Sequence, residues 1–205
     1  MYLLPKDLNQ AILDMEKAIL ANLNSSNSRL TIEYKFEGIK FNNIAFKIYK
    51  LLETKRKVFL VFSDAGAVAL AQRDYKTIKE NIFTFKSFNE SKFIADNNSV
   101  VISIIPQPYD FETFESMCEN FMGLHISINP KFEDASIGIG SVVRERRKNF
   151  QNTWINIYYI QPLEKGALMH VSPDNWSLFK EQNNMYTFIK DFETKPDNET
   201  IFVNL

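Results

Sequence analysis

Several residue types that usually announce a particular chemistry are scarce in this chain of 205 residues. A single cysteine, Cys118, excludes an internal disulfide and fits a reducing compartment. It lies in a helical pattern without a local partner, so we read it as structural. The two histidines, His125 and His170, have no cysteine, histidine or carboxylate at ligand spacing. We therefore expect neither a disulfide framework nor a metal centre.

Long apolar runs are also lacking. The longest hold about six to eight residues, whereas a helix that crosses a bilayer needs roughly 20. The first ten residues, MYLLPKDLNQ, do not show a basic segment followed by an apolar one, as a signal peptide would. We therefore expect a soluble protein with no transmembrane segment.

An excess of charge of either sign is missing too. Lysine and arginine total 24, aspartate and glutamate total 25, and the formal net charge is −1. A nucleic-acid-binding domain usually carries a strong positive field, so no such partner is expected, and any anion site would have to be local.

The glycine-rich and nucleophile motifs of common enzymes are absent as well. With six glycines, the chain has neither a G-x-G-x-x-G dinucleotide turn nor a Walker phosphate loop. It has no G-x-S-x-G elbow, and no serine is accompanied by a credible histidine and acid. We expect no bound cofactor and no enzymatic activity.

The most informative stretch that is present runs from Lys57 to Tyr75, KVFLVFSDAGAVALAQRDY. Residues 58–62 are apolar without alternation, which is typical of a strand covered on both faces. Ser63, Asp64 and Gly66 then supply residues that start helices. The stretch predicts a central strand that turns directly into a helix.

The remainder of the N-terminal part alternates helical and strand patterns. An apolar stripe from Leu8 to Leu23 predicts an amphipathic helix, and alternation over 29–36 predicts a strand that buries one face. A second helix opens at Asn42. Further predictions are an edge strand over 82–88, a buried strand over 99–105, a helix capped by Asp110 and closed by Gly123, and a strand over 124–128. Because helices separate the strands, these strands should be parallel.

From Thr153 the pattern changes to short strand-like runs joined by connectors of two to four residues, such as Pro173-Asp174-Asn175. Connectors this short favour antiparallel strands, and residues 201–205 are predicted as a last strand. The fold class is therefore α/β, with a mostly parallel central sheet covered by helices and a C-terminal antiparallel meander. We expect one domain, with residues 4–150 alternating and 151–205 antiparallel.

Ligands of open α/β sheets usually bind beyond the carboxyl ends of parallel strands. Here those ends deliver residues 63–66, 106–108 and 129–130 to one rim. The helix start at Asp64 offers amide donors for an anion, but the aspartate itself would occupy them as a cap. Two interpretations of this helix start stay open. It is either a site for an anion or nucleotide, or a structural feature in which Asp64 caps the helix and small residues allow close packing on the sheet.

A second candidate is the stretch 138–150, GIGSVVRERRKNF, in which two glycines precede a probable basic helix. Arg147 falls on the side that should meet the core, while Arg144 lies on another side. An inward arginine needs a partner such as Asp134 or Asp64. The helix therefore suits a solvated basic face, a structural salt bridge, or a site for an anion or acidic partner.

Several motifs together resemble a known family: FSDAGAVALAQRDY, INPKFEDASIGIG and RERRKNF, then YYIQPL, GALMHV and the tryptophan of DNW. They resemble an uncharacterised domain family of cyanobacteria and plants. Its members include a chloroplast factor needed for photosystem II accumulation and a domain fused behind a chloroplast adenylate kinase. The resemblance runs from Leu4 to about Pro196. One departure is Ser63, where the family has a proline before the aspartate.

The resemblance implies a non-enzymatic accessory or assembly factor of oxygenic photosynthesis that contacts photosynthetic or thylakoid membrane-biogenesis proteins. It implies a location in the plastid stroma or cyanobacterial cytoplasm, with peripheral contact at the thylakoid. The alternative is a module that binds a nucleotide or other anion at the strand-end rim. The family's recurrent polar positions correspond to Asp64, Gly66, Arg73, Asp74, Asn129, Asp134, Arg144 and Arg147, as ligand- or partner-binding candidates without assigned roles.

Overall fold

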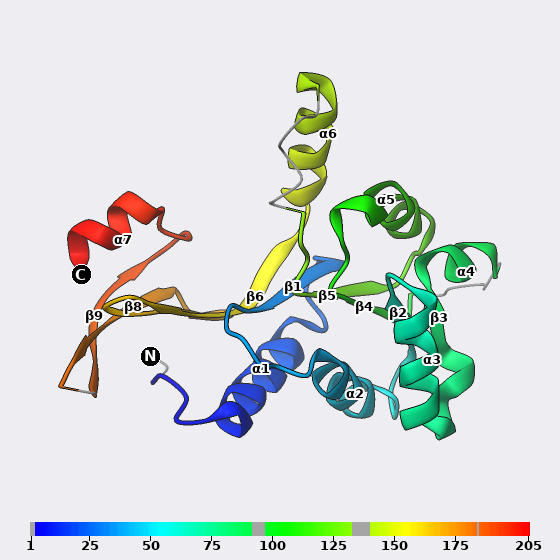
Figure 1. Ribbon diagram of the computed structural model, residues 1–205, viewed down its shortest axis with the longest axis horizontal. Coiled ribbons are helices and arrows are strands. Elements are labelled where there is room, and N and C mark those ends of the chain that lie inside the picture. Colours follow the sequence, from blue (N-terminus) through cyan, green and yellow to red (C-terminus); the bar gives the residue numbers. More distant parts are fainter. Residues whose placement is uncertain (1–2, 92–96, 133–139, 184) are drawn as a thin grey trace. The chain divides into compact units, whose positions relative to one another are not determined.

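The computed structural model describes residues 3–91, 97–132, 140–183 and 185–205 (Figure 1). The elements of the first half are α1 (Leu8–Asn22), β1 (Arg29–Tyr34), α2 (Phe41–Leu52), β2 (Lys57–Phe62), α3 (Ala65–Asp74), the 3-10 helix η1 (Lys76–Asn81), β3 (Ile82–Thr84), α4 (Phe85–Glu90) and β4 (Ser99–Ile104). Those of the second half are the 3-10 turn η2 (Pro108–Asp110), α5 (Phe111–Asn120), β5 (Leu124–Ile128), α6 (Ser141–Gln151), β6 (Ile155–Leu163), β7 (Gly166–Val171), β8 (Trp176–Gln182), β9 (Met185–Phe192) and α7 (Asn198–Asn204).

The strand order in this part of the chain is β3-β2-β4-β5-β1-β6-β7-β8-β9, a nine-stranded mixed sheet. The chain divides into two compact units, one formed by residues 1–25, 32–39 and 156–205 and the other by residues 26–31 and 40–155. The predicted α/β class with a C-terminal antiparallel meander is confirmed. The single domain remains a prediction.

In the unit formed by residues 26–31 and 40–155, the parallel strands β2, β4 and β5 run in register, with Phe62 opposite Ile104 and Ile104 opposite Ile128. Every residue of β4 and β5 is buried, and so is β2 from Val58 onward. Parallel neighbours require crossover connections, and these bring α2 and α3 to one side and α4 and α5 to the other (Figure 1). The absence of alternation in residues 58–62 thus correctly predicted a strand covered on both faces.

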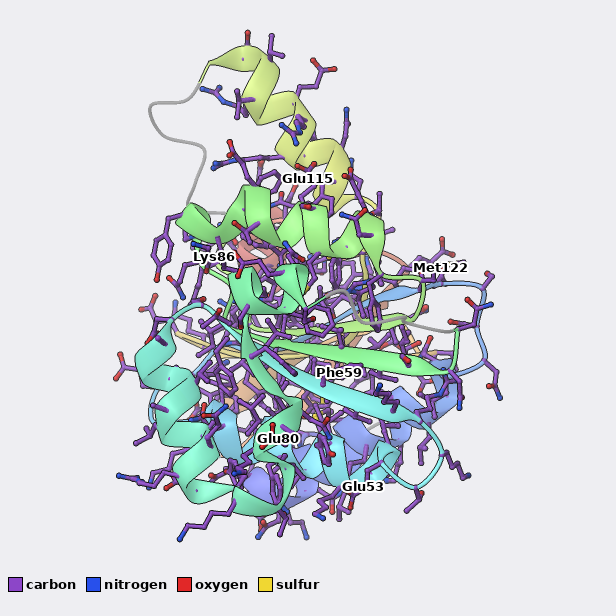
Figure 2. The ribbon with its side chains drawn as sticks, turned by 90° about the vertical axis from the view of Figure 1, so that its right-hand side faces the viewer. Glu53, Phe59, Glu80, Lys86, Glu115 and Met122 are labelled. Carbon is purple, nitrogen blue, oxygen red and sulfur yellow. The ribbon has the colours of Figure 1, made fainter. Side chains whose placement is uncertain are left out.

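The side covered by α4 and α5 is filled mainly by aromatic rings. Phe114 on α5 lies at its centre, with ring centroids 5.5 Å from Phe85, 5.1 Å from Phe132 and 5.4 Å from Trp154. Phe59 on β2 belongs to the same cluster, and its position within the strands is visible in Figure 2. Edge-on and offset ring pairs of this kind add to the energy gained from removing apolar area from water.

The other unit contains the antiparallel meander, in which β6 pairs with β7, β7 with β8, and β8 with β9. Ile201 of α7 packs in a cluster with Tyr159, Trp176 and two leucines of β7 and β8. The prediction of a last strand over 201–205 is therefore wrong. Asp197 accepts a hydrogen bond from the Thr200 backbone N–H at 2.8 Å, and this cap starts a helix instead.

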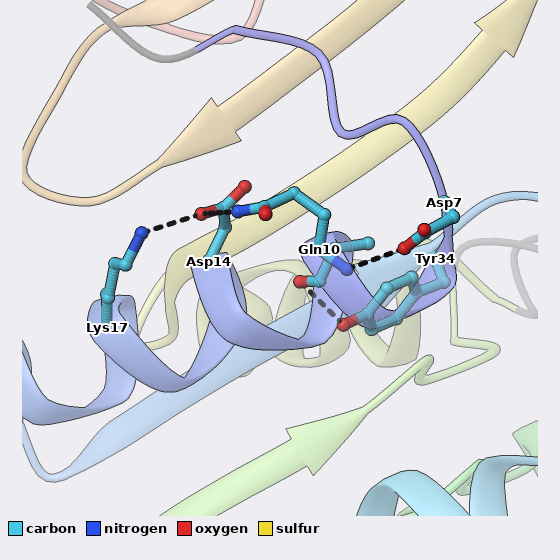
Figure 3. A network of polar contacts seen from close by, with 6 residues as sticks. Asp7, Gln10, Asp14, Lys17 and Tyr34 are labelled. Carbon is cyan, nitrogen blue, oxygen red and sulfur yellow. Dashed lines mark hydrogen bonds and ion pairs between the residues drawn. The ribbon is translucent and has the colours of Figure 1, made fainter.

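In the same unit, a buried carboxylate on α1, that of Asp14, is paired with side chains of the same helix (Figure 3). Asp14 is 3% exposed, accepts a hydrogen bond from Gln10 Nε2 at 3.1 Å and pairs with Lys17 Nζ at 3.1 Å. Beside it the Tyr34 hydroxyl donates to the Ala11 carbonyl at 3.3 Å, and burial is the main cause that raises the pKa of Tyr34. The polar groups that α1 buries are thus paired, as buried polar groups must be.

The prediction that β1 buries one face is wrong, because its second face is buried as well. Glu33 is 8% exposed although it is charged. Its carboxylate pairs with Lys35 Nζ at 2.6 Å and accepts a hydrogen bond from Asn156 Nδ2 at 2.9 Å. These partners make the burial of the charge possible, and one of them lies more than a hundred residues away in the chain.

The edge strand predicted over 82–88 is confirmed only for Ile82–Thr84, since α4 begins at Phe85. Thr84 Oγ1 accepts from the Ser87 backbone N–H at 3.0 Å, and Ser87 Oγ accepts from the Thr84 N–H at 2.9 Å. This reciprocal capping box starts a helix where the apolar residues alone suggested a strand.

The predicted limits of α5 need a smaller correction. Asp110 holds the N-cap position, but its carboxylate accepts from the Gln107 backbone N–H at 2.8 Å and so caps η2. The helix ends at Asn120, before Gly123. Gly123 has another role: an added Cβ would lie 2.2 Å from the Ser99 carbonyl oxygen.

We therefore predict that Gly123→Ala destabilises the protein by about 1–3 kcal/mol, the range for forcing extra atoms into a packed site. Gly140→Ala is the matched control, because no atom lies within 4 Å of its added Cβ. We expect the control to cost less than about 1 kcal/mol, the usual effect of a changed N-cap residue. Urea denaturation of both variants measures the difference, and equal losses would contradict this account of Gly123.

Candidate functional site

The register of β2, β4 and β5 brings their carboxyl ends to one rim, as the sequence predicted. The backbone of Ile105 forms several hydrogen bonds at this rim. Its carbonyl accepts from Ser63 Oγ at 3.3 Å and from Gln107 Nε2 at 2.9 Å. Its own N–H donates to the Ile128 carbonyl at 2.9 Å. The polar side chains at the strand ends thus bind the backbone of the rim itself.

Two residues of this rim have left-handed backbone conformations. Ile105 has φ 48° and Asn129 has φ 47°, and Asn129 is 4% exposed. The conformation costs an L residue roughly 1–2 kcal/mol and is least costly for asparagine, so Ile105 is the strained one. Strain of this kind persists only where the surroundings impose it, and it is often found near functional sites.

Asp64 acts as the N-cap of α3. Its Oδ1 accepts from the Ala67 backbone N–H at 2.8 Å. A Cβ added at Gly66 would lie 3.0 Å from the same oxygen, so this glycine leaves space for the cap. Further along α3, Arg73 Nε and Asp74 Oδ1 pair at 2.8 Å on the surface. These four predicted site residues therefore make local contacts of α3.

The predicted basic residues lie on α6. Arg147 is half-buried, with its guanidinium carbon 4.8 Å from the centroid of the Phe111 ring, so it does face the core as predicted. Arg144 is exposed. Asp134, proposed as a partner for Arg147, lies outside the described residues. Whether the predicted site residues act together stays a prediction.

The sequence analysis missed one polar pair, formed by Arg146 and Glu115. The Glu115 side chain, labelled on α5 in Figure 2, is 6% exposed. It forms a salt bridge with Arg146 of α6. A signal was present, because Glu115 follows Phe114 in the apolar stripe of α5 and is four residues from Phe111. A carboxylate in such a stripe needs a cation from elsewhere in the fold.

Between α5 and α6 lies an open groove of about 600 Å³. Arg29, one of its lining residues, donates to Thr153 Oγ1 at 2.9 Å and to the Cys118 carbonyl at 3.1 Å. Its lining residues are Arg29, Glu115, Glu119, Val142, Glu145, Arg146, Asn149, Phe150 and Thr153. Burial raises the pKa of the Cys118 thiol, so the thiol is held in its unreactive protonated form.

His125 is a buried titratable group that lies beside the aromatic residues near this groove. Its Nε2 lies 3.3 Å from the Phe121 carbonyl, which can only accept, so Nε2 carries the proton. Burial is the largest effect on its pKa and lowers it from 6.5 to about 4, and the nearby Arg29 acts in the same direction. His125 is therefore neutral in the folded protein near neutral pH.

Among the described residues, no cluster of three or more histidine, cysteine, aspartate or glutamate side chains has the geometry of a metal site. None of the helices in the same part of the chain combines the length and apolarity that spanning a membrane requires.

We predict that His125 makes stability depend on pH. Between pH 6.5 and about 4 the unfolded chain binds a proton that the folded chain does not. Stability is therefore complete above pH 6.5 and falls as the pH decreases, with a slope approaching about 1.4 kcal/mol per pH unit. Denaturant titrations of wild type and His125→Phe, which cannot titrate, measure this term. Parallel stability curves over this pH range would contradict it.

We also predict that Asp64→Ala lowers the free energy of unfolding by about 1 kcal/mol, because the cap of α3 is lost. Asp64→Ser should retain most of that stability, since serine also accepts at an N-cap. Urea denaturation measures both variants. A stable Asp64→Ala variant would show that the cap contributes little and would leave Asp64 free for another role.

Comparison with known proteins gives one match. The family model described as "Domain of unknown function (DUF1995)" matches residues 5–202. No curated protein and no solved structure matches the chain. Since the matched segment spans both compact units and nearly every element from α1 to α7, the chain belongs to the DUF1995 family, a domain of unknown function.

Proposed function

We propose that the protein is a non-enzymatic accessory or assembly factor of oxygenic photosynthesis, active in photosystem biogenesis through protein contacts. The observation that carries the proposal is the order and spacing of the motifs from FSDAGAVALAQRDY to DNW, which resemble a family of cyanobacteria and plants. Membership of the DUF1995 family over residues 5–202 is consistent with it. The expected partners are photosynthetic or thylakoid membrane-biogenesis proteins, in the plastid stroma or cyanobacterial cytoplasm and at the thylakoid periphery.

Several large apolar side chains are exposed on the surface and are available for protein contacts. Tyr109 at η2 and Phe202 on α7 are 76% and 82% exposed, and Met122 and Val142 are similarly open to solvent. Aromatic residues and methionine are enriched in protein interfaces, where their burial contributes most of the binding energy. Single exposed apolar residues are common, so these support the proposal without defining an interface.

The alternative is a module that binds a nucleotide or another anion at the strand-end rim. The strained backbone at Ile105 favours it, because strain often marks functional sites. Two observations weigh against it: the Asp64 carboxylate occupies a donor at the start of α3, and the Ser63 and Gln107 side chains bind the rim backbone. We therefore prefer the protein-contact proposal.

Affinity isolation of the tagged full chain from its native organism, combined with a deletion strain, tests the proposal. We expect photosynthetic or membrane-biogenesis proteins to be enriched over an untagged control, and photosystem II to decrease in the deletion strain. Reintroducing the wild-type chain should restore photosystem II. The proposal fails if no such protein is recovered and photosystem levels in the deletion strain are normal.

A further inference from the structure

The compact unit formed by residues 1–25, 32–39 and 156–205 contains an apolar cavity of about 270 Å³. The segment that leads into α1 and the first turn of α1 line one part of it, and residues of β6, β7 and β9 line another. Most of the lining side chains are aliphatic or aromatic, among them Leu4, Leu8, Phe36, Ile160 and Pro162. All of them belong to the same compact unit, and none belongs to the strand-end rim.

Small residues leave this space. Ala11 on α1 and Ala167 on β7 both line the cavity and are buried, at 2% and 5% exposed. A cavity of about 150 Å³ with apolar walls is enough to hold benzene. The present cavity therefore has room for an apolar molecule of roughly eight to ten carbon atoms.

Two of the lining residues, Asp7 and Tyr186, have polar side chains, and both are exposed. Asp7 lies at the start of α1, where its Oδ1 accepts a hydrogen bond from the Gln10 backbone N–H at 2.9 Å (Figure 3). A carboxylate has further acceptor positions beyond the one used for this cap. The Tyr186 hydroxyl donates to Glu181 Oε2 at 3.4 Å, so its oxygen stays an acceptor with a second carboxylate next to it.

The polar groups at the cavity thus favour a positive charge. None of the described residues that line it has a cationic side chain, and the exposed Lys6 is not among them. The partial positive charge at the start of α1, about half a unit, is smaller than the unit charge of the Asp7 carboxylate. A carboxylate or phosphate ligand would be repelled here, whereas an ammonium group would be attracted and would donate to the acceptor oxygens.

We propose that this cavity binds a small amphiphilic amine, with an apolar body of roughly eight to ten carbon atoms and a protonated primary amino group. The apolar walls bury the body, and the ammonium group lies beside Asp7 and Tyr186. Burial of the body supplies most of the affinity, while the carboxylate sets the orientation and selects the charge. This binding site goes beyond the proposed function and does not depend on it.

Calorimetric titration of the purified full chain at pH 7 and low salt tests the ligand class. The probes are n-octylammonium chloride, n-butylammonium chloride, n-octanol and sodium octanoate. We expect one octylammonium ion to bind per chain, about tenfold or more tightly than octanoate. Butylammonium should bind at least tenfold more weakly than octylammonium, because each buried methylene contributes about fourfold in affinity.

Asp7→Asn tests the charge, because asparagine is as good an N-cap as aspartate and the start of α1 is kept. The variant should bind octylammonium about two- to fivefold more weakly, as expected for the loss of an exposed ion pair, and octanol as wild type does. Asp197→Asn is the matched control: Asp197 caps α7 in the same unit by accepting from the Thr200 N–H at 2.8 Å, and it does not line the cavity. The control should change neither affinity.

Ala11→Met tests the cavity itself, because the longer side chain occupies space that the ligand needs. It should weaken the binding of both octylammonium and octanol by about tenfold or more. Ala21→Met makes the same exchange at an exposed alanine of α1 outside the lining and should leave both affinities unchanged. Thermal melting without ligand checks that the variants fold.

The proposal is overturned if octylammonium does not bind, if octanoate binds as tightly, or if folded Ala11→Met binds both ligands as wild type does. It is also overturned if Asp7→Asn loses no more affinity for octylammonium than Asp197→Asn. Should Ala11→Met not fold, butylammonium still decides, since an affinity equal to that of octylammonium would show that the apolar body is not bound. Isolation of protein partners has no bearing on these titrations, so each proposal can fail without the other.

Discussion

The burial of β2, β4 and β5 on both faces is the constraint from which the rest of their compact unit follows. Each fully buried aliphatic or aromatic side chain contributes roughly 1.5–3 kcal/mol relative to exposure, so uncovered strands of this composition would be strongly unfavourable. Parallel pairing requires long connections, and the connections become the helices that cover the two faces. The same register aligns Phe62, Ile104 and Ile128, so the strand ends converge on one rim.

The aromatic cluster on the α5 side shows how covering the strands also buries polar residues. Rings from α4, α5 and α6 and from the loop residues Phe132 and Trp154 enclose the cluster. His125 and Glu115 lie beside it and are buried with it. The histidine stays neutral, whereas the glutamate is paired with Arg146, so each avoids an unpaired buried charge by a different route.

How much of this the sequence predicts depends on how far apart the interacting residues lie. The strand at 58–62 and the antiparallel meander follow from local pattern and connector length, and both are confirmed. The segments at 82–88 and 201–205 are short apolar runs, which suit a helix or a strand equally, and the caps at Thr84 and Asp197 decide for helices. The capping residues are visible in the sequence, but the apolar residues were given more weight.

The contacts of the polar residues were harder to predict from the sequence, because their partners lie far away in the chain. The burial of Glu33 and the pairing of Glu115 depend on partners 123 and 31 residues away, which no local pattern specifies. Arg147 was predicted from helical periodicity to face the core, and it does, with its guanidinium over the Phe111 ring; the salt bridge between Arg146 and Glu115 was not predicted. Periodicity thus identifies the side of a helix that meets the protein, while the partner comes from tertiary structure.

The polar side chains at the rim of β2, β4 and β5 stabilise the fold, and this bears on which function the rim can have. The side chains of Ser63 and Gln107 donate hydrogen bonds to backbone at the strand ends, and the Asp64 carboxylate accepts one from backbone at the start of α3. These hydrogen bonds stabilise the strand ends and the start of the helix. An anion bound at this rim would have to displace the Asp64 carboxylate from the Ala67 N–H, so the hydrogen bonds of the rim weigh against the anion-binding alternative.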